Sequence, residues 1–256
     1  MKKADYREIA GFYDKGRSLS EQNMDLWLGL ISRYSGAGEG ARVLDLGCGT
    51  GRFAIPMAVK LNFRVNGADS YPEMLTKAQE KDTGKTVIWN CMDAQNLKYA
   101  DSSFDVVFVS HLLHHVDSPA EVLSDCNRIL GNSGVILIRY GAIEQIRNDV
   151  EHTFFPETLD IDEPRTPGIE TVEKWLIDAG FSGIKTEEVV QKTYESTESH
   201  LQAITVKATS VMTMISPQAH EQGLQKLAEY VEENPDDPWL MHDRMALTVG
   251  HKRKDG

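Results

Sequence analysis

The sequence predicts an α/β fold with a doubly wound, mostly parallel sheet of seven strands, N-terminal helices and a helical insertion before the last strand. Two observations support this prediction. From residue 41 onward, short apolar runs alternate with segments of helical periodicity, as in consecutive βαβ units. The 256 residues, 41% of them hydrophobic, suit one large domain, so we treat 1–256 as a single domain.

The first 36 residues (1–36) are expected to form a helical cover for the sheet. Apolar side chains recur at helical spacing in residues 4–13 and again in residues 23–34. The stretch SGAGEG, residues 35–40, then ends this helical part.

Seven apolar runs are expected to form the strands. Because helical segments separate most of them, the crossovers should be right-handed and both faces of the sheet should be covered. The runs are residues 41–47, 63–69, 85–90, 104–110, 134–141, 181–190 and 244–252.

Two of the connecting helices carry start signals. After the second strand, Ser70 and Glu73 have capping-box spacing. After the fourth strand, Ser118 is expected as the N-cap, Pro119 as the first helical residue and Gly131 as the stop. A further helix is expected before the sixth strand.

Residues 192–243 form an insertion with the pattern of two helices. Apolar residues share one helical face through 200–216, and Ser216 with the following proline starts a second helix that ends at NPDDP, residues 234–238. We expect this insertion to be a cap on the substrate side of the sheet. An extra packing layer or a dimer face would give the same pattern.

Composition excludes several classes of protein. The net charge of −12 disfavours nucleic-acid partners, and no stretch approaches the roughly 20 apolar residues of a membrane span. The residues after Met1 lack an apolar signal-peptide core, so the expected location is cytoplasmic. The three cysteines form neither a disulfide framework nor a CxxC metal site. The pattern leaves the oligomeric state open.

The most informative stretch is DLGCGTG, residues 45–51, which follows the first strand. Three glycines at alternate positions, after an acidic residue at a strand end, indicate that a ligand lies close to the main chain. A dinucleotide fingerprint counted from Gly47 and Gly49 would require a small residue where Arg52 stands, so that pattern fails. The pattern D/E-x-G-x-G-x-G matches at every position.

With this loop, the chain resembles the class I S-adenosylmethionine (SAM)-dependent methyltransferases, specifically the small-molecule group that includes the ubiquinone/menaquinone biosynthesis enzymes. The resemblance covers residues 41–190 and the final strand. It implies the Rossmann-like methyltransferase fold and SAM as the cofactor. In place of the family's usual Pro-Gly-Gly turn before the fifth strand, this chain has Asn132-Ser133-Gly134.

The resemblance also assigns roles at the strand ends. Asp69 ends the second strand, where a carboxylate can accept hydrogen bonds from both ribose hydroxyls. Asp93 would take the adenine amino group, with the backbone N–H of Ala94 and the side chain of Met92 against the ring. The full set of expected cofactor contacts is Tyr13, Arg17, Asp45, Gly47, Cys48, Gly49, Gly51, Asp69, Ser70, Met74, Met92, Asp93, Ala94 and Ser110.

Three histidines follow the fourth strand, in HLLHH at 111–115. His111, His114 and His115 are the candidate catalytic residues, because this exit faces the methyl group in the family fold and a histidine there can serve as a general base. A purely structural role remains open. No metal is expected, since three adjacent imidazoles would need an open geometry and supporting partners.

Substrate contacts are expected from side chains after the fifth strand and in the long connection that follows it. A connection of this length favours a functional role, although a pair of phenylalanines more often belongs to a core. The candidates are Arg139, Phe154, Phe155 and Arg165.

The predicted function is transfer of a methyl group from SAM to a small molecule by in-line displacement. The exit of the fourth strand reads Ser-His-Leu-Leu and lacks the Asn/Asp-Pro-Pro-Tyr motif of relatives that methylate nucleic acids or glutamine. A protein or RNA methyltransferase, or a SAM-binding module without catalysis, are the alternatives. The sequence does not identify the accepting atom.

Overall fold

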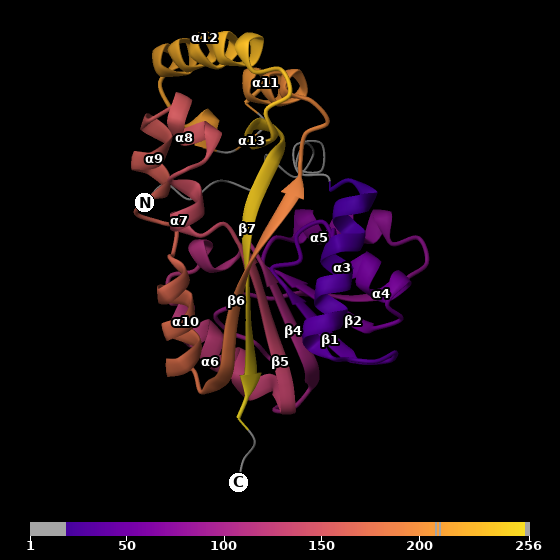
Figure 1. Cartoon of the computed structure of the whole chain (residues 1–256). Helices are drawn as coiled ribbons and strands as arrows, with labels where there is room; N and C mark the ends of the chain where they lie inside the picture. Colours follow the sequence, from indigo (N-terminus) through magenta and orange to yellow (C-terminus); the bar gives the residue numbers. More distant parts are fainter. Residues whose placement is uncertain (1–18, 208, 210, 254–256) are drawn as a thin grey trace.

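A computed structural model describes residues 19–207, 209 and 211–253 of the chain (Figure 1). Its centre is one seven-stranded sheet in the order β3-β2-β1-β4-β5-β7-β6, in which β7 runs antiparallel to both its neighbours. The other neighbouring pairs are parallel, which confirms the predicted fold class. The strands are β1 Arg42–Leu46, β2 Arg64–Asp69, β3 Val87–Cys91, β4 Phe104–Ser110, β5 Leu130–Tyr140, β6 Phe181–Lys192 and β7 His242–Lys252.

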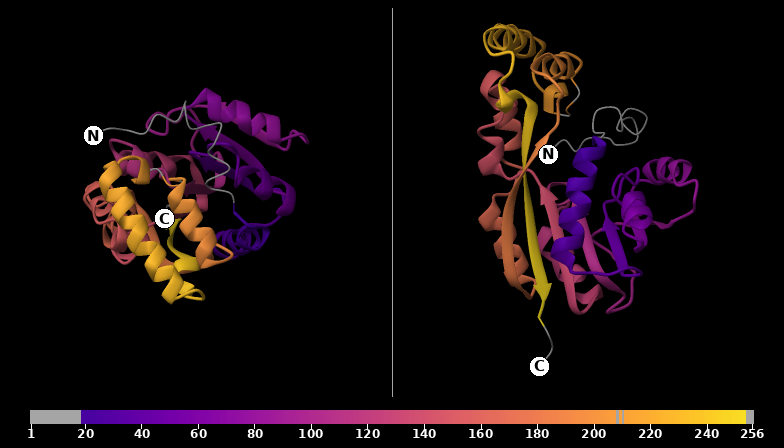
Figure 2. Two further views of the ribbon diagram at one scale, coloured as in Figure 1. Left: turned by 90° about the horizontal axis from the view of Figure 1, so that it is seen from above. Right: turned by 45° about the vertical axis from the view of Figure 1, so that its right-hand side comes forward.

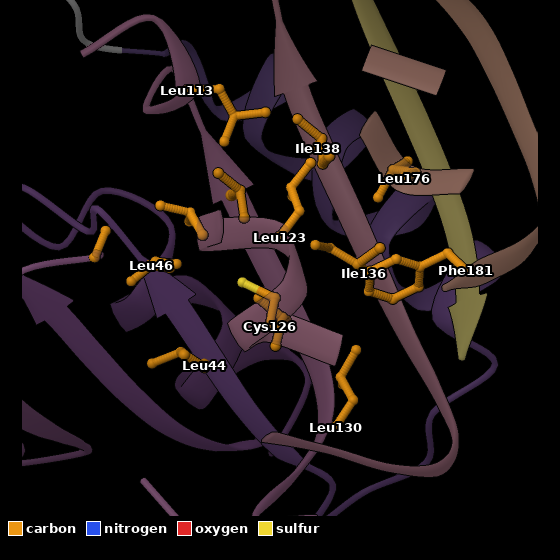
Figure 3. Packing of buried hydrophobic residues seen from close by; sticks show 14 of the residues in the cluster. Leu44, Leu46, Leu113, Leu123, Cys126, Leu130, Ile136, Ile138, Leu176 and Phe181 are labelled. Atoms are coloured by element: carbon orange, nitrogen blue, oxygen red, sulfur yellow. The ribbon is translucent and has the colours of Figure 1, made fainter. Parts of the chain in front are cut away.

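Helices bury apolar residues against both faces of the sheet. One core packs α6 and α10 against β4 and β5, with Leu123, Ile136 and Leu176 fully buried (Figure 3). The other packs α3 and α4 around Trp27 and Phe108. The two faces are therefore filled separately, as a doubly wound sheet requires. These helices, with α5, are α3 Glu21–Ser35, α4 Ala54–Lys60, α5 Pro72–Lys81, α6 Pro119–Ile129 and α10 Ile169–Asp178.

A third, smaller core lies beyond the carboxyl ends of the parallel strands, on the extended ends of β6 and β7 (Figure 2, right). We call this unit the cap. It joins the segment between β5 and α10 to the insertion between β6 and β7, and its centre contains Phe155, Met212 and Leu227. Its helices are α7 Ile143–Ile146, α8 Val150–Phe154, α9 Glu157–Asp162, α11 Thr197–Thr205, α12 Pro217–Glu233 and α13 Pro238–Met241, with a 3-10 turn η2 at Val211–Thr213.

Several helix boundaries differ from the predicted ones. The face through 200–216 is not one helix, since α11 ends at Thr205 and helical structure resumes only at η2. The capping box at Ser70 is wrong: α5 begins at Pro72, and its N-cap is Tyr71. Gly131 does not end α6, because Leu130 already starts β5.

Other start signals are confirmed. Ser118 is the N-cap of α6, although its side chain makes no capping hydrogen bond, and Pro119 is the first helical residue. Ser216 caps α12, where its hydroxyl accepts a hydrogen bond from the backbone N–H of Ala219. The helix expected at residues 4–13 lies outside the described residues.

Candidate functional site

The glycine loop connects β1 to the helix that follows and is tied to β2 through backbone groups. The backbone N–H groups of Gly47 and Cys48 donate to the carbonyl oxygen of Ala68, at 2.8 and 3.0 Å. The N–H of Gly49 donates to a carboxylate oxygen of Asp69 at 2.9 Å. The two strand ends are thereby fixed side by side at the carboxyl edge of the sheet.

The loop glycines have different physical reasons to be glycine. Gly49 has a φ of 52°, and a Cβ added there would meet nothing within 4 Å, so its missing side chain leaves space open. Gly51 has a φ of 78°, and a Cβ there would lie 2.6 Å from the ring of Trp89. Packing against Trp89 therefore requires glycine at position 51, whereas the open space at Gly49 leaves room for a ligand next to the backbone.

A cavity of about 210 Å³ opens beside the loop, and we call it the glycine-loop cavity. Most of the expected cofactor contacts meet there. Its lining is Leu46, Gly47, Gly49, Ala68, Asp69, Ser70, Tyr71, Met74, Met92, Asp93, Ala94, Gln95, Ser110, His111, Leu112, His115 and Val116.

Some predicted cofactor residues do not line this cavity. Asp45 is buried beneath the loop, where its carboxylate accepts the backbone N–H of Ala54. Burial raises the pKa of Asp45 to about 7, and the charge of Arg52 partly opposes this. Cys48 and Gly51 belong to the loop but do not line the cavity, and Cys48 is buried. The structure therefore does not bring these three expected cofactor contacts to the surface of the cavity.

Tyr13 and Arg17, the two cofactor residues expected near the N-terminus, lie outside the described residues.

Asp69 lines the glycine-loop cavity. One carboxylate oxygen accepts from Gly49, and the other accepts from the backbone N–H of Tyr71 at 2.9 Å. Burial raises the pKa of Asp69, while these two N–H groups oppose the shift because they favour the charged form. Two backbone hydrogen bonds thus hold the carboxylate of this cavity residue in a fixed orientation.

The loop after β3 also lines this cavity. The N–H of Met92 donates to the carbonyl oxygen of Asp69 at 2.9 Å, which joins this loop to β2. Asp93 is exposed and accepts from the N–H of Gln95 at 2.9 Å. Sequence reasoning missed Gln95, Tyr71 and several apolar residues of the lining, because no side-chain pattern distinguishes them from ordinary loop residues.

The three histidines stand between this cavity and a second one. His111 follows β4 with a φ of 53°, uncommon for a residue other than glycine, and its N–H donates to the carbonyl oxygen of Arg139 at 2.9 Å. The ring of His114 lies 6.3 Å from that of His111 and 3.9 Å from that of His115, between centroids. His115 lines the glycine-loop cavity, His114 lines the second cavity, and His111 lines both.

The second cavity, of about 280 Å³, lies between the sheet edge and the cap, and we call it the cap cavity. Eight of its side chains are Asp, Glu or Arg. Its lining is Leu19, Arg52, His111, His114, Arg139, Gly141, Ile146, Asp149, Glu151, His152, Asp162, Arg165, Thr166, Gln191, Thr193, Tyr194, Thr209, Val211, Asp243, Arg244 and Met245.

Two of the four expected substrate residues reach this cavity. Arg139 and Arg165 line it, and Arg165 is paired with Asp162. Phe155 is instead fully buried in the cap core, where it fills the space beside Gly223. Phe154 packs its ring against Tyr230, with centroids 5.4 Å apart. The phenylalanine pair belongs to the cap core and lines neither cavity, because an apolar pair next to two apolar helices is buried with them.

Carboxylates concentrate on the cap side of the cap cavity. Burial, together with the charges of Asp149 and Asp243, raises the pKa of Glu151 to about 8. Burial and the charge of Asp243 raise the pKa of Asp149 to about 6. Within the described residues, no group of three or more His, Cys, Asp or Glu side chains could hold a metal ion.

No helix in the described part of the chain is long and apolar enough to cross a membrane.

Comparison with protein families places the methyltransferase-domain family on residues 44–138, which is the glycine loop and the strands around it. A ubiquinone/menaquinone biosynthesis C-methyltransferase of Bdellovibrio bacteriovorus is 30% identical over 66% of this chain and 73% of its own. A ubiquinone biosynthesis O-methyltransferase of Cereibacter sphaeroides is 35% identical, over 39% of this chain and 40% of its own.

Solved structures share the fold. A phosphoethanolamine N-methyltransferase 2 of Haemonchus contortus, in complex with SAM, matches with a TM-score of 0.64 at 20% identity, over 98% of this chain and 61% of its own. The cyclase SpnF matches with a TM-score of 0.62 at 19% identity, over 94% of this chain and 85% of its own. The same fold therefore carries more than one chemistry, and the acceptor must be inferred from the site.

Proposed function

The chain belongs to the class I SAM-dependent methyltransferases, and from this premise we propose that it methylates a small polar molecule bound in the cap cavity. One observation carries the proposal: the two cavities share His111, so a molecule in the cap cavity lies next to the end of the cofactor site. The cofactor is SAM, and the reaction is methyl transfer to a small molecule.

The lining of the glycine-loop cavity fits SAM. The open space at Gly49 lets a ligand lie against the backbone, and Asp69 offers carboxylate lone pairs where ribose hydroxyls can donate. We assign Asp93 and Ala94 to the adenine edge, Met92 to its face, and Ser110 to the methionine end. Their places around one cavity support these roles.

The protein's share of the chemistry is alignment and proton removal. SAM supplies a methyl group already activated by its positive sulfur. The cap cavity then has to orient the acceptor toward His111 and restrict water, and such alignment can contribute several kcal/mol, on the order of 7–11 in well-oriented systems. For a hydroxyl or another protonated acceptor, a base must also take the proton.

We assign that base to the histidines that face the acceptor. Of the three histidines, His114 lines only the cap cavity and His115 lines only the glycine-loop cavity, whereas His111 lines both. We therefore place the general base at His114 and an alignment role at His111. Their single alanine variants separate the roles: His114→Ala should lose turnover most at low pH, where a replacing hydroxide is scarce, and His111→Ala should lose it at all pH values.

The acceptor is inferred to be polar because of what lines the cap cavity. Buried arginine and glutamine side chains form its floor, and carboxylates form its cap side. An apolar ring system would shield these groups from water and offer them no hydrogen bonds in return, at a cost of roughly 1–3 kcal/mol for each group so affected. Relatives named for ubiquinone biosynthesis therefore do not define this chain's acceptor.

The test is a screen of metabolites for conversion of SAM to S-adenosylhomocysteine (SAH). Polar acceptors with ionisable groups are expected to give turnover, and phenol and quinol analogues of similar size are the comparison set. Turnover confined to the apolar analogues would refute the polar acceptor. Turnover with an RNA or protein substrate alone, or SAM binding without turnover, would favour the alternative functions.

We place the reaction in the cytoplasm. All three cysteines are free in the structure, as is usual in reducing compartments.

A further inference from the structure

Arg139 is an expected substrate contact that lines the cap cavity, and the groups around it point to a further role. It lies on β5, next to Ser110 of β4 in the sheet register, and only 3% of its surface is exposed. A buried guanidinium carries a large desolvation cost, so it persists only where its neighbours compensate. The groups that contact the guanidinium therefore indicate the role of Arg139.

On the side of the cap cavity, where we propose that the acceptor binds, aromatic and amide side chains contact the guanidinium of Arg139. Its carbon lies 4.6 Å from the ring centroid of Trp27 and 5.5 Å from that of Phe53, at cation–π distance. One terminal nitrogen donates to Oε1 of Gln191 at 3.4 Å. The same oxygen accepts from the indole N–H of Trp27 at 2.7 Å, so Gln191 and Trp27 form one buried support.

That support continues into the cap cavity. The amide nitrogen of Gln191 donates to the hydroxyl of Thr193 at 3.2 Å, which in turn donates to the carboxylate of Asp243 at 2.6 Å. All three residues line the cap cavity. The position of Arg139 is thus linked to the wall against which an acceptor would bind.

On its other side, Arg139 fixes the exit of β4 twice. Its second terminal nitrogen donates to the hydroxyl of Ser110 at 3.3 Å, and its own carbonyl oxygen accepts the N–H of His111 at 2.9 Å. His111 has a left-handed backbone, a conformation that persists only when the surrounding contacts determine it. Ser110 and His111 both line the glycine-loop cavity.

We propose that Arg139 is a positioning residue: it holds Ser110 and His111 at the junction of the two cavities and acts on methyl transfer through them. The inference rests on the proposed function, since it assigns the cofactor and the acceptor to the two cavities. It differs from the substrate-contact role in one measurable way. Loss of a substrate contact raises KM for the acceptor, whereas loss of positioning lowers kcat and weakens cofactor binding.

The experiment titrates SAH into the whole protein by calorimetry. Arg139→Met keeps the bulk and removes the charge and the donors, and the expected result is an SAH affinity weaker by on the order of threefold to tenfold. Arg139→Lys, which keeps the charge but loses the forked geometry, should fall between this variant and the wild type. Gln191→Leu leaves the arginine in place but removes its support, and should shift the affinity in the same direction by less.

The matched control is Arg128→Met on α6. Arg128, like Arg139, is a hydrogen-bonded arginine; it is in addition ion-paired with Asp101 and Asp125, and it lines neither cavity. Its replacement should lower the melting temperature and leave SAH affinity within about twofold. An Arg139→Met protein that is destabilised similarly but binds SAH like the wild type would overturn the proposal.

With an acceptor from the screen, Arg139→Met should lower kcat while KM for the acceptor stays within about threefold. A raised KM with unchanged kcat would overturn the positioning role in favour of a direct contact. If Arg139→Met does not fold, the Arg139→Lys and Gln191→Leu proteins decide the same question. Failure of the wild-type protein to bind SAH would instead refute the proposed function.

Discussion

The two cavities differ in how the chain builds them. The glycine-loop cavity is made from loops that each follow directly after β1, β2, β3 or β4, so its residues stand at fixed places relative to a strand end. The cap cavity takes side chains from the ends of β4 and β5, from the β5–α10 segment, from the end of β6 and the insertion after it, from the start of β7, and from Leu19 and Arg52. The first can therefore be located in a sequence, while the second exists only after the cap has packed.

The largest expected effect is a loss of stability on replacing one loop glycine, Gly51, which contrasts with a loss of cofactor binding on replacing another, Gly49. Gly51→Ala would place a Cβ 2.6 Å from the ring of Trp89 at a residue with positive φ, and should destabilise the protein by about 2–4 kcal/mol. Gly49→Ala also carries backbone strain, of about 1–2 kcal/mol, but its Cβ points into open space. It should instead weaken SAH binding by on the order of tenfold or more.

Chemical denaturation and SAH titration of both variants test this contrast. If Gly49→Ala binds SAH normally, the ligand does not lie against the loop where we place it. If Gly51→Ala is as stable as the wild type, Trp89 is able to move away and the packing argument is wrong.

The difference in how the two cavities are built also decides which site residues could be predicted from the sequence. The strands and Asp69 were predictable because apolar runs mark the strands and Asp69 ends one of them, whereas Asp93 was expected only from the resemblance to the family. Gln95 and Leu112 were not, since a residue inside a loop carries no periodic signal and its contacts depend on the neighbouring loop. Asp45 carries a signal, but one that does not distinguish a contact to the ligand from a contact to the loop.

The sequence predicts the helices of the cap but not how they pack, and the reason is physical. Helical periodicity correctly showed that α12 has an apolar face. It could not show that this face packs on Phe155, almost seventy residues earlier in the chain. Periodicity indicates that a face is buried, but only tertiary packing determines which residues cover it. The same packing placed Phe155 inside the cap core and Phe154 against it, although both are expected substrate contacts.

A second, smaller effect is expected at Asp69, where a cofactor contact and a loop contact coincide. Asp69→Ala should weaken SAH binding by roughly 1–3 kcal/mol, because ribose hydroxyls and the N–H groups of Gly49 and Tyr71 lose their acceptor. Asp69→Asn keeps one acceptor oxygen and should lose less. Calorimetry measures both, and equal affinities for the alanine variant and the wild type would move the ribose site elsewhere.

The smallest effect is expected in the cap cavity, as a change in the pH dependence of stability. The pKa of Glu151 is raised from an ordinary 4.5 to about 8, so the folded protein holds a proton there that the unfolded chain releases earlier. Ionisation of Glu151 therefore lowers the free energy of unfolding. This loss is absent below about pH 4.5, grows as the pH rises from about 4.5 to about 8, and stays constant above about pH 8. Asp149, Asp162 and Asp243 contribute to the shift.

Glu151→Gln removes this cost while keeping an oxygen that can accept the hydrogen bond from Thr209. The fall in melting temperature between pH 5 and pH 9 should be smaller in the variant, by a few degrees, about the effect of 1 kcal/mol in a domain of this size. Glu229→Gln, on the exposed side of α12, is the control and should follow the wild type. Parallel curves for all three proteins would show that water reaches Glu151 freely. The cap would then leave the second cavity open to solvent, and alignment would have to come from the floor around Arg139 and the histidines alone.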